Sequence, residues 1–204
     1  MTTTNEQAPT VFIVDDDAAI RFAMQALMDS VNLNHEIFGS GDEFLEKMDD
    51  QRPGCLVLDI RMPGLGGLEL QEELIKRGNT LPIIFITGHG DVPMAVEAMQ
   101  KGAVDFIQKP FRDQELLDRI REALATDEER RVAQQHHAEV AGRLDRLTNR
   151  EREVFDLVVT GKPNKVIAYE LGVSQRTVEI HRARVMEKMQ ARSLADLVKM
   201  HMTA

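Results

Sequence analysis

Four short apolar runs in the first 110 residues of the chain are each followed by a carboxylate, hydroxyl or ammonium side chain. Clustered carboxylates repel one another, and a hard cation such as Mg²⁺ relieves that repulsion. A carboxylate in such a cluster can act as a nucleophile and form an aspartyl phosphate. Phosphoryl transfer mainly needs positioning and neutralisation of charge, which a cation and an ammonium group can supply. The residues are Asp15 and Asp16 after residues 11–14, Asp59 after 55–58, Thr87 after 83–86, and Lys109 shortly after 106–107.

These side chains meet only if the apolar runs are strands that end at one edge of a sheet. Over residues 1–125, apolar runs typical of strands buried on both faces alternate with helical patterns. Five strands alternating with five helices predict an α/β fold with a doubly wound parallel sheet. Ligands of such sheets bind beyond the carboxyl ends of the strands. The runs lie at residues 11–14, 37–38, 55–58, 83–86 and 106–107.

The 204 residues divide by charge as well as by pattern. Residues 1–125 carry a net charge of −11 and residues 148–204 one of +3, which suggests two modules with different partners. We expect a flexible tail over residues 1–8, the sheet domain over 9–125, a charged helical linker over 126–147 and an all-α domain over 148–204. A single Cys excludes a disulfide framework, and no apolar run approaches the ~20 residues needed to cross a bilayer, so we expect a cytoplasmic protein.

The third of four helical patterns in the second module, from Ser174 to about Met189, has two distinct faces. An apolar stripe on one face is typical of a helix packed on a core. The other face mixes arginines with apolar and acidic side chains, which favours a place in a DNA major groove. Together with the preceding helix and Gly172, this pattern predicts a helix-turn-helix. The stripe is Val178, His181, Val185 and Met189, and the other face is Arg176, Glu179, Ile180, Ala183, Arg184 and Glu187.

Both modules resemble parts of one known family. The residues Asp15-Asp16, Asp59, Thr87 and Lys109-Pro110, together with the stretch 85–111, resemble the receiver domain of two-component response regulators of the NarL/FixJ type. The stretches 163–165 and 174–182 are similar to the LuxR-type DNA-binding domain of the same family. The resemblance covers the whole chain. It implies a flavodoxin-like receiver joined to a helix-turn-helix domain, in a transcription regulator whose only catalysis is its own phosphorylation and dephosphorylation.

The resemblance implies roles at the acidic cluster. Asp59 would be the phosphoacceptor, and Thr87 and Lys109 would contact the phosphoryl group. Phe106 takes the position of an aromatic switch. Arg61 and His89 would flank the water that attacks during dephosphorylation. The implied ligands of Mg²⁺ are Asp15, Asp16, Asp59 and the carbonyl oxygen of Arg61.

The resemblance also implies surfaces and partners. The partners would be a sensor histidine kinase, double-stranded promoter DNA, a second copy of the chain after phosphorylation, and RNA polymerase. We expect phosphorylation to draw Thr87 inward and bury Phe106, so that two receivers pair through residues 91–111. The implied DNA phosphate contacts are Lys165, Thr177 and Lys188. The implied dimer contacts are Val92, Val96 and Met99 in the receiver and Leu194, Leu197 and Val198 in the last helix.

Two other functions fit parts of the pattern. Phosphatases of the haloacid dehalogenase type also phosphorylate an Asp after a strand, but they carry a second Asp two residues later, where this chain has Arg61. The second alternative is a DNA-binding regulator whose receiver is a phosphorylation-independent interaction module. The complete acidic set argues against this reading, and a phosphoryl mass gain on Asp59 would separate the two.

Overall fold

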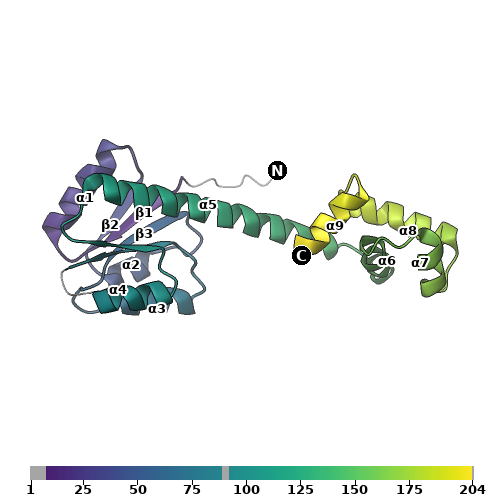
Figure 1. The fold of residues 1–204 in the computed structure, drawn as a ribbon, viewed down its shortest axis with the longest axis horizontal. Helices are drawn as coiled ribbons and strands as arrows, with labels where there is room; N and C mark the ends of the chain where they lie inside the picture. The colour runs from purple at the N-terminus through teal and green to yellow at the C-terminus, as the bar shows by residue number, and fades with distance from the viewer. Residues whose placement is uncertain (1–7, 89–91, 204) are drawn as a thin grey trace. The chain divides into compact units, whose positions relative to one another are not determined.

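The computed structural model describes residues 8–88 and 92–203, and these form two compact units that divide after Arg130 (Figure 1). Most of the predicted tail, residues 1–8, lies outside the described residues, as does His89. Within the described part of the chain, no helix has the length and apolar character that a membrane span requires.

The first unit is built on a parallel five-stranded sheet with the order β2-β1-β3-β4-β5, which confirms the predicted doubly wound fold. The Val-, Ile-, Leu- and Phe-rich runs form its central strands because helices cover both faces of the sheet and bury alternate side chains on either side. The strands are β1 (Thr10–Val14), β2 (His35–Phe38), β3 (Gly54–Asp59), β4 (Ile83–Thr87) and β5 (Asp105–Gln108).

Helices cover the two faces of this sheet in two groups (Figure 1). Phe44, Leu70 and Ala98 lie in the core on one face, whereas Met28 and Ile120 lie in the core on the other. Helices α2 (Gly41–Lys47), α3 (Gly67–Lys76) and α4 (Val92–Gln100) cover the first face, and α1 (Ala18–Ser30) and α5 (Asp113–Leu144) cover the second.

Helix α5 extends well beyond the sheet that it covers. Its first turns pack on the sheet through Leu116 and Ile120, and Asp127 is still buried in the first unit. The carboxylate of Asp127 accepts a 3.0 Å hydrogen bond from the N–H of Gly54, at the start of β3. The helix then continues through most of the predicted linker to Leu144, which is buried in the core of the second unit.

The second unit contains four helices after α5 among its described residues, as predicted. Thr148 and Glu151 form a reciprocal capping box at the start of α6. Gly172 ends α7 in the left-handed region, with φ of 65°, and the Ser174 side chain accepts from the N–H of Thr177 to start α8. The helices are α6 (Asn149–Val159), α7 (Asn164–Leu171), α8 (Gln175–Lys188) and α9 (Leu194–Thr203).

Candidate functional site

The ammonium group of Lys109 joins two carboxylates at the carboxyl edge of the sheet. Its Nζ lies 2.7 Å from Oδ1 of Asp59 and 2.9 Å from Oδ2 of Asp15. Asp15 is 1% and Asp59 7% exposed, so both acidic groups are largely withdrawn from water. The structure therefore brings three of the side chains expected at this edge into one hydrogen-bonded cluster.

Strand order explains why residues far apart in the chain meet here. Strand β3, which ends in Asp59, lies between β1 and β4, so Asp15 follows one neighbour and Thr87 ends the other. The N–H of Lys109 donates to the Thr87 carbonyl over 2.7 Å, which places Lys109 just beyond β5. Thr87 itself is 4% exposed at this edge.

Burial and charge act against each other at Asp59. Burial raises the pKa of Asp59 above its ordinary value, while the hydrogen bond from Lys109 limits the rise. For Lys109, burial acts to lower the pKa, but the hydrogen bonds to Asp59 and Asp15 outweigh it and the pKa is raised. The ammonium form of Lys109 is therefore the stable one beside these carboxylates.

Main-chain N–H groups orient the second oxygen of each carboxylate. Oδ1 of Asp15 accepts from the N–H of Asp17 over 2.8 Å, and Oδ2 of Asp59 accepts from the N–H of Arg61 over 3.0 Å. Asp17 also caps α1 through its side chain, as its place before the helix predicts. Backbone geometry thus holds the carboxylates in defined orientations before any ligand binds.

The start of α3 packs closely against the backbone of Asp59 at the end of β3. A Cβ atom added to Gly67, at the start of α3, would lie 2.4 Å from the carbonyl oxygen of Asp59. Only glycine leaves room for the helix to pack this closely on the strand end. Substitution of Gly67 would therefore displace α3 or the phosphoacceptor candidate.

The donor set of the cluster suits a hard divalent cation. Two buried carboxylates face one ammonium group, so the buried part of the site keeps an excess of negative charge. Mg²⁺ is commonly held by one or two carboxylates, with water and phosphate oxygens completing its shell. Over residues 8–88 and 92–203, no three His, Cys, Asp or Glu side chains are already grouped to hold an ion by themselves. Asp16, the third predicted carboxylate ligand, is exposed.

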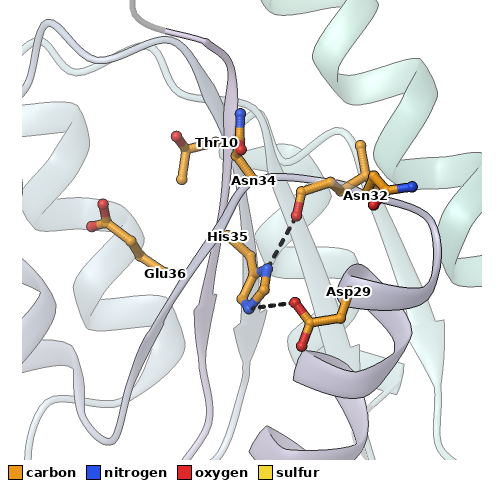
Figure 2. A pocket seen from close by; sticks show the side chains of 7 residues that line it. Thr10, Asp29, Asn32, Asn34, His35 and Glu36 are labelled. Carbon is orange, nitrogen blue, oxygen red and sulfur yellow. Dashed lines mark hydrogen bonds and ion pairs between the residues drawn. The ribbon is translucent and has the colours of Figure 1, made fainter.

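A hollow of about 440 Å³ lies beside the cluster and has Lys109, Pro110 and Phe111 in its wall. A second hollow, of about 510 Å³, lies at the β2 and α1 side of the unit and has mainly polar walls (Figure 2). There His35 contacts the Leu33 carbonyl over 3.1 Å and the Asp29 carboxylate over 3.8 Å. None of the predicted site residues lines this second hollow.

Apolar side chains are exposed on α4 and β5, where the sequence predicted a receiver dimer surface. Phe106 is 41% and Val96 49% exposed, and Met99 and the neighbouring Val104 are exposed as well. The side chain of Val92 lies outside the described residues. The described members of the predicted surface are therefore open to contact, and the dimer surface itself stays a prediction.

The predicted DNA-reading face of α8 is exposed. Val178, Val185 and Met189 are fully buried, so the apolar stripe packs into the core as predicted. Ile180 is 44% exposed on the other side, and Arg176 pairs only loosely with Glu179, over 3.6 Å. The remaining members of this face, Ala183, Arg184 and Glu187, are exposed too.

Two of the predicted DNA phosphate contacts are already engaged within the protein. Nζ of Lys188 donates to the buried Glu151 carboxylate over 2.6 Å and to the Arg146 carbonyl over 3.0 Å. The hydroxyl of Thr177 lies 2.8 Å from that of Ser174 in the helix cap. Lys165 is exposed. Of the three, Lys165 is the one whose position leaves it most open to DNA.

One predicted dimer contact needs correction. Leu197 is 0% exposed and belongs to the core of the second unit, so it does not lie on a surface that a second copy could reach. Leu194 is 38% exposed and Val198 is partly exposed. Of the three predicted contacts, Leu194 and Val198 stay candidates for a dimer surface on α9, whereas Leu197 packs into the helical core.

Sequence reasoning missed Arg21, which contacts the loop that carries two of the acidic residues. Its Nη1 donates to the carbonyl oxygens of Asp15 and Asp16 over 2.7 and 2.8 Å. A basic residue one turn into the helix that follows an Asp-Asp pair was the available signal. This signal was not used because a charged residue near the start of a helix is usually solvated.

Comparison with known proteins shows relatives over almost the whole chain. Residues 11–121 match the response regulator receiver domain, and residues 145–201 match the luxR family of bacterial regulatory proteins. The chain is 50% identical over 193 residues to Nodulation protein W of Bradyrhizobium diazoefficiens, covering 95% of this chain and 85% of that protein. It is 45% identical over 194 residues to the transcriptional regulatory protein FixJ of Azorhizobium caulinodans, covering 95% and 92%.

Solved structures give the same picture. The response regulator StyR matches with a TM-score of 0.89 and 44% identity, over 97% of this chain and 100% of that one. Full-length FixJ from B. japonicum matches with a TM-score of 0.61 and 41% identity, over 97% of both chains.

Proposed function

This chain belongs to the NarL/FixJ family of two-component response regulators that control transcription, and we propose that phosphorylation of Asp59 switches its binding to promoter DNA. A cognate sensor histidine kinase would supply the phosphoryl group. The P–N bond of its phosphohistidine breaks as a bond forms between phosphorus and an Asp59 oxygen. The contact of Asp59 with Lys109, inside a buried acidic cluster, is the observation that carries the proposal.

The chain's own residues would do most of the work at this site. The ammonium group of Lys109, held between Asp59 and Asp15, is available to neutralise an incoming phosphoryl oxygen. The Thr87 hydroxyl, at the end of the neighbouring strand, would donate to another. Burial keeps bulk water away from Asp59, which strengthens these electrostatic contacts.

Mg²⁺ is the cofactor that the cluster fits. Asp15, Asp16, Asp59 and the Arg61 carbonyl oxygen would hold it, and the ion would supply positive charge to the phosphate oxygens. With Arg61 and His89 flanking the water that removes the phosphoryl group, the receiver would also catalyse its own dephosphorylation.

Signal would pass from the cluster to the α4–β5 surface. We expect a phosphoryl group to draw Thr87 inward, which lets the exposed ring of Phe106 bury itself. The charge-assisted hydrogen bonds that a phosphoryl group gains contribute about 1.5–3 kcal/mol each, and about 5.5 kcal/mol moves an equilibrium from 1:99 to 99:1. At about 2 kcal/mol each, three contacts, from Thr87, Lys109 and Mg²⁺, are just sufficient to shift the receiver to a dimerising form.

DNA reading belongs to the exposed face of α8. Ile180 and Ala183 would contact thymine methyls, and Arg176 or Arg184 would read guanine or phosphate, with Glu179 accepting from cytosine. Lys165 would add a phosphate contact. Two paired receivers would bring two such helices onto half-sites about one DNA turn apart, where RNA polymerase is the expected next partner.

The test combines mass measurement with DNA binding. The full chain is treated with acetyl phosphate and Mg²⁺, and the phosphoryl mass gain is measured on the intact protein. The phosphorylated residue is then located in a borohydride-reduced sample, because reduction releases the phosphate and converts the labelled aspartate to homoserine. We expect the label on Asp59 and a matching rise in affinity for a selected operator duplex, with both effects absent in Asp59→Asn. A chain that binds the duplex equally well with and without the label would instead be a phosphorylation-independent regulator.

A further inference from the structure

Arg21 makes two short charge-assisted contacts with the backbone of the acidic loop. One guanidinium nitrogen, Nη1, donates to the carbonyl oxygen of Asp15 over 2.7 Å and to that of Asp16 over 2.8 Å. Arg21 begins the second turn of α1, where its own N–H bonds the Asp17 carbonyl over 3.0 Å. The side chain therefore folds back from the helix onto the loop that enters it.

The same guanidinium reaches a second loop. A Cβ atom added to Gly39 would lie 3.7 Å from both Arg21 Nη1 and Glu43 Oε2. Glu43 accepts from the Gly39 N–H over 2.8 Å, and its pKa is lowered by its bond to Lys47 first and by the charge of Arg21 among the weaker causes. Arg21 thus lies between the loop after β1 and the loop after β2, and Gly39 leaves it room.

Arg21 donates to two carbonyl groups of the loop after β1, whereas the hydrogen bond from the Asp17 N–H orients the Asp15 side chain. Asp15 is fixed at its side chain by the Asp17 N–H and by Lys109, but Asp16 is exposed. Without Arg21, two adjacent carbonyl groups would lose a charged donor, and the peptide planes between Asp15 and Asp17 could rotate. Rotation of those planes moves the Asp15 and Asp16 side chains directly.

We propose that Arg21 is a positioning residue for the phosphorylation site, which holds the Asp15–Asp16 loop in the shape that lets both carboxylates serve a divalent cation. The inference rests on the proposed function, since it concerns the same cation. Arg21 contacts main-chain oxygens and acts through the acidic residues. Partners of this kind behind metal ligands change metal affinity typically 10- to 100-fold when they are removed.

The experiment compares the full-length unphosphorylated protein with Arg21→Met, Arg21→Lys and the control Gln25→Ala, an exposed residue on the same helix. Mg²⁺ affinity is measured by calorimetry, and folding by thermal unfolding without the ion. The rate of labelling by acetyl phosphate is then followed against Mg²⁺ and against phosphodonor concentration.

We expect Mg²⁺ binding about tenfold weaker in Arg21→Met, with Arg21→Lys recovering part of the loss and Gln25→Ala unchanged. Labelling should need more Mg²⁺ but reach a similar rate when the ion saturates. Three outcomes overturn the inference. The first is unchanged Mg²⁺ affinity in Arg21→Met, with or without lower thermal stability. The second is tighter Mg²⁺ binding, and the third is an effect only on how the labelling rate depends on phosphodonor concentration. If the unsubstituted protein neither binds Mg²⁺ nor becomes labelled, the proposed function itself fails.

Discussion

Nζ of Lys109 lies 2.7 Å from Oδ1 of Asp59, and the same ammonium group also bonds Asp15. One cation therefore serves two buried carboxylates before any ligand is present. The two carboxylates carry more negative charge at the strand edge than the one ammonium group neutralises. It also makes the cluster sensitive to any change that removes the ammonium group.

Replacement of Lys109 by Met should destabilise the receiver near neutral pH. Burial raises the pKa of Asp59, which means that the ionised carboxylate is less stable in the folded receiver than in the unfolded chain. The hydrogen bond from Lys109 reduces this destabilisation. We expect a loss of about 1–3 kcal/mol in the free energy of unfolding, below the value for a fully buried pair because Lys109 is partly open to water. The loss should shrink as pH falls toward 3.8, the ordinary pKa of Asp59, since the carboxyl then protonates in both states.

Urea denaturation of the full chain over this pH range measures the effect, with Lys76→Met, an exposed lysine of the same unit, as the control. A Lys109→Met deficit that stays constant down to acid pH would contradict the electrostatic explanation.

The ion pair of Lys188 with Glu151 should stabilise the second unit. The bond from Lys188, followed by the Thr148 N–H, lowers the pKa of Glu151 to about 2. Stability from this carboxylate is therefore present above its ordinary pKa of 4.5 and is lost as pH falls through about 2. We expect Glu151→Gln or Lys188→Met to weaken protection of α6 and α8 amides by about 2 kcal/mol at neutral pH.

Hydrogen exchange of the full chain measures this protection segment by segment, and Lys199→Met, an exposed lysine of α9, provides the control. Equal protection in Lys188→Met and Lys199→Met would contradict the structural role of Lys188.

Phe106 should matter for dimerisation and little for folding. Because its ring is 41% exposed, we expect Phe106→Ala to change the stability of the unphosphorylated protein by less than about 1 kcal/mol. Dimerisation of the phosphorylated protein should weaken at least about tenfold, because without the ring the inward movement of Thr87 no longer reshapes the α4–β5 surface. Sedimentation of the acetyl phosphate-treated chain measures this. Phe22→Ala, which removes a 74% exposed ring from α1, should dimerise normally.

DNA contacts should separate into sequence-specific and salt-dependent ones. Lys165→Met should weaken binding to all duplexes and reduce the salt slope by about 0.9. Ile180→Ala should weaken only operator binding, by about 1 kcal/mol, or roughly fivefold. Titrations of a selected operator and a scrambled duplex at several salt concentrations distinguish them. Lys188→Met should leave the salt slope unchanged, because Lys188 is bonded to Glu151 within the protein. A reduced slope would instead indicate that Lys188 contacts DNA phosphate.

Asp127 should hold the middle of α5 against the start of β3. Its carboxylate accepts from the buried Gly54 N–H and pairs with Arg130, which also donates to the Thr80 carbonyl. Asp127→Ala leaves a buried donor unpaired, for a loss of about 1–3 kcal/mol. Hydrogen exchange at the start of β3 should rise in this variant and stay unchanged in Glu128→Ala, whose side chain is exposed.

The sequence by itself determined the fold class and the acidic cluster. Strand ends could be read because short apolar runs alternate with helical patterns, and parallel strands must bring Asp15, Asp59 and Lys109 to one edge. The caps at Asp17, Thr148 and Ser174 were also readable, since each acts within three residues of its own position.

Only the tertiary structure decided which polar side chains are already engaged. Lys188 meets Glu151 across 37 positions of the chain, and Asp127 meets the Gly54 N–H across 73. Leu197 turned out to be core for the same reason, as it packs on helices outside its own segment. Local patterns predict which face of a helix is apolar. The partners of an exposed-looking charge depend on how distant segments pack, and that is a property of the folded chain alone.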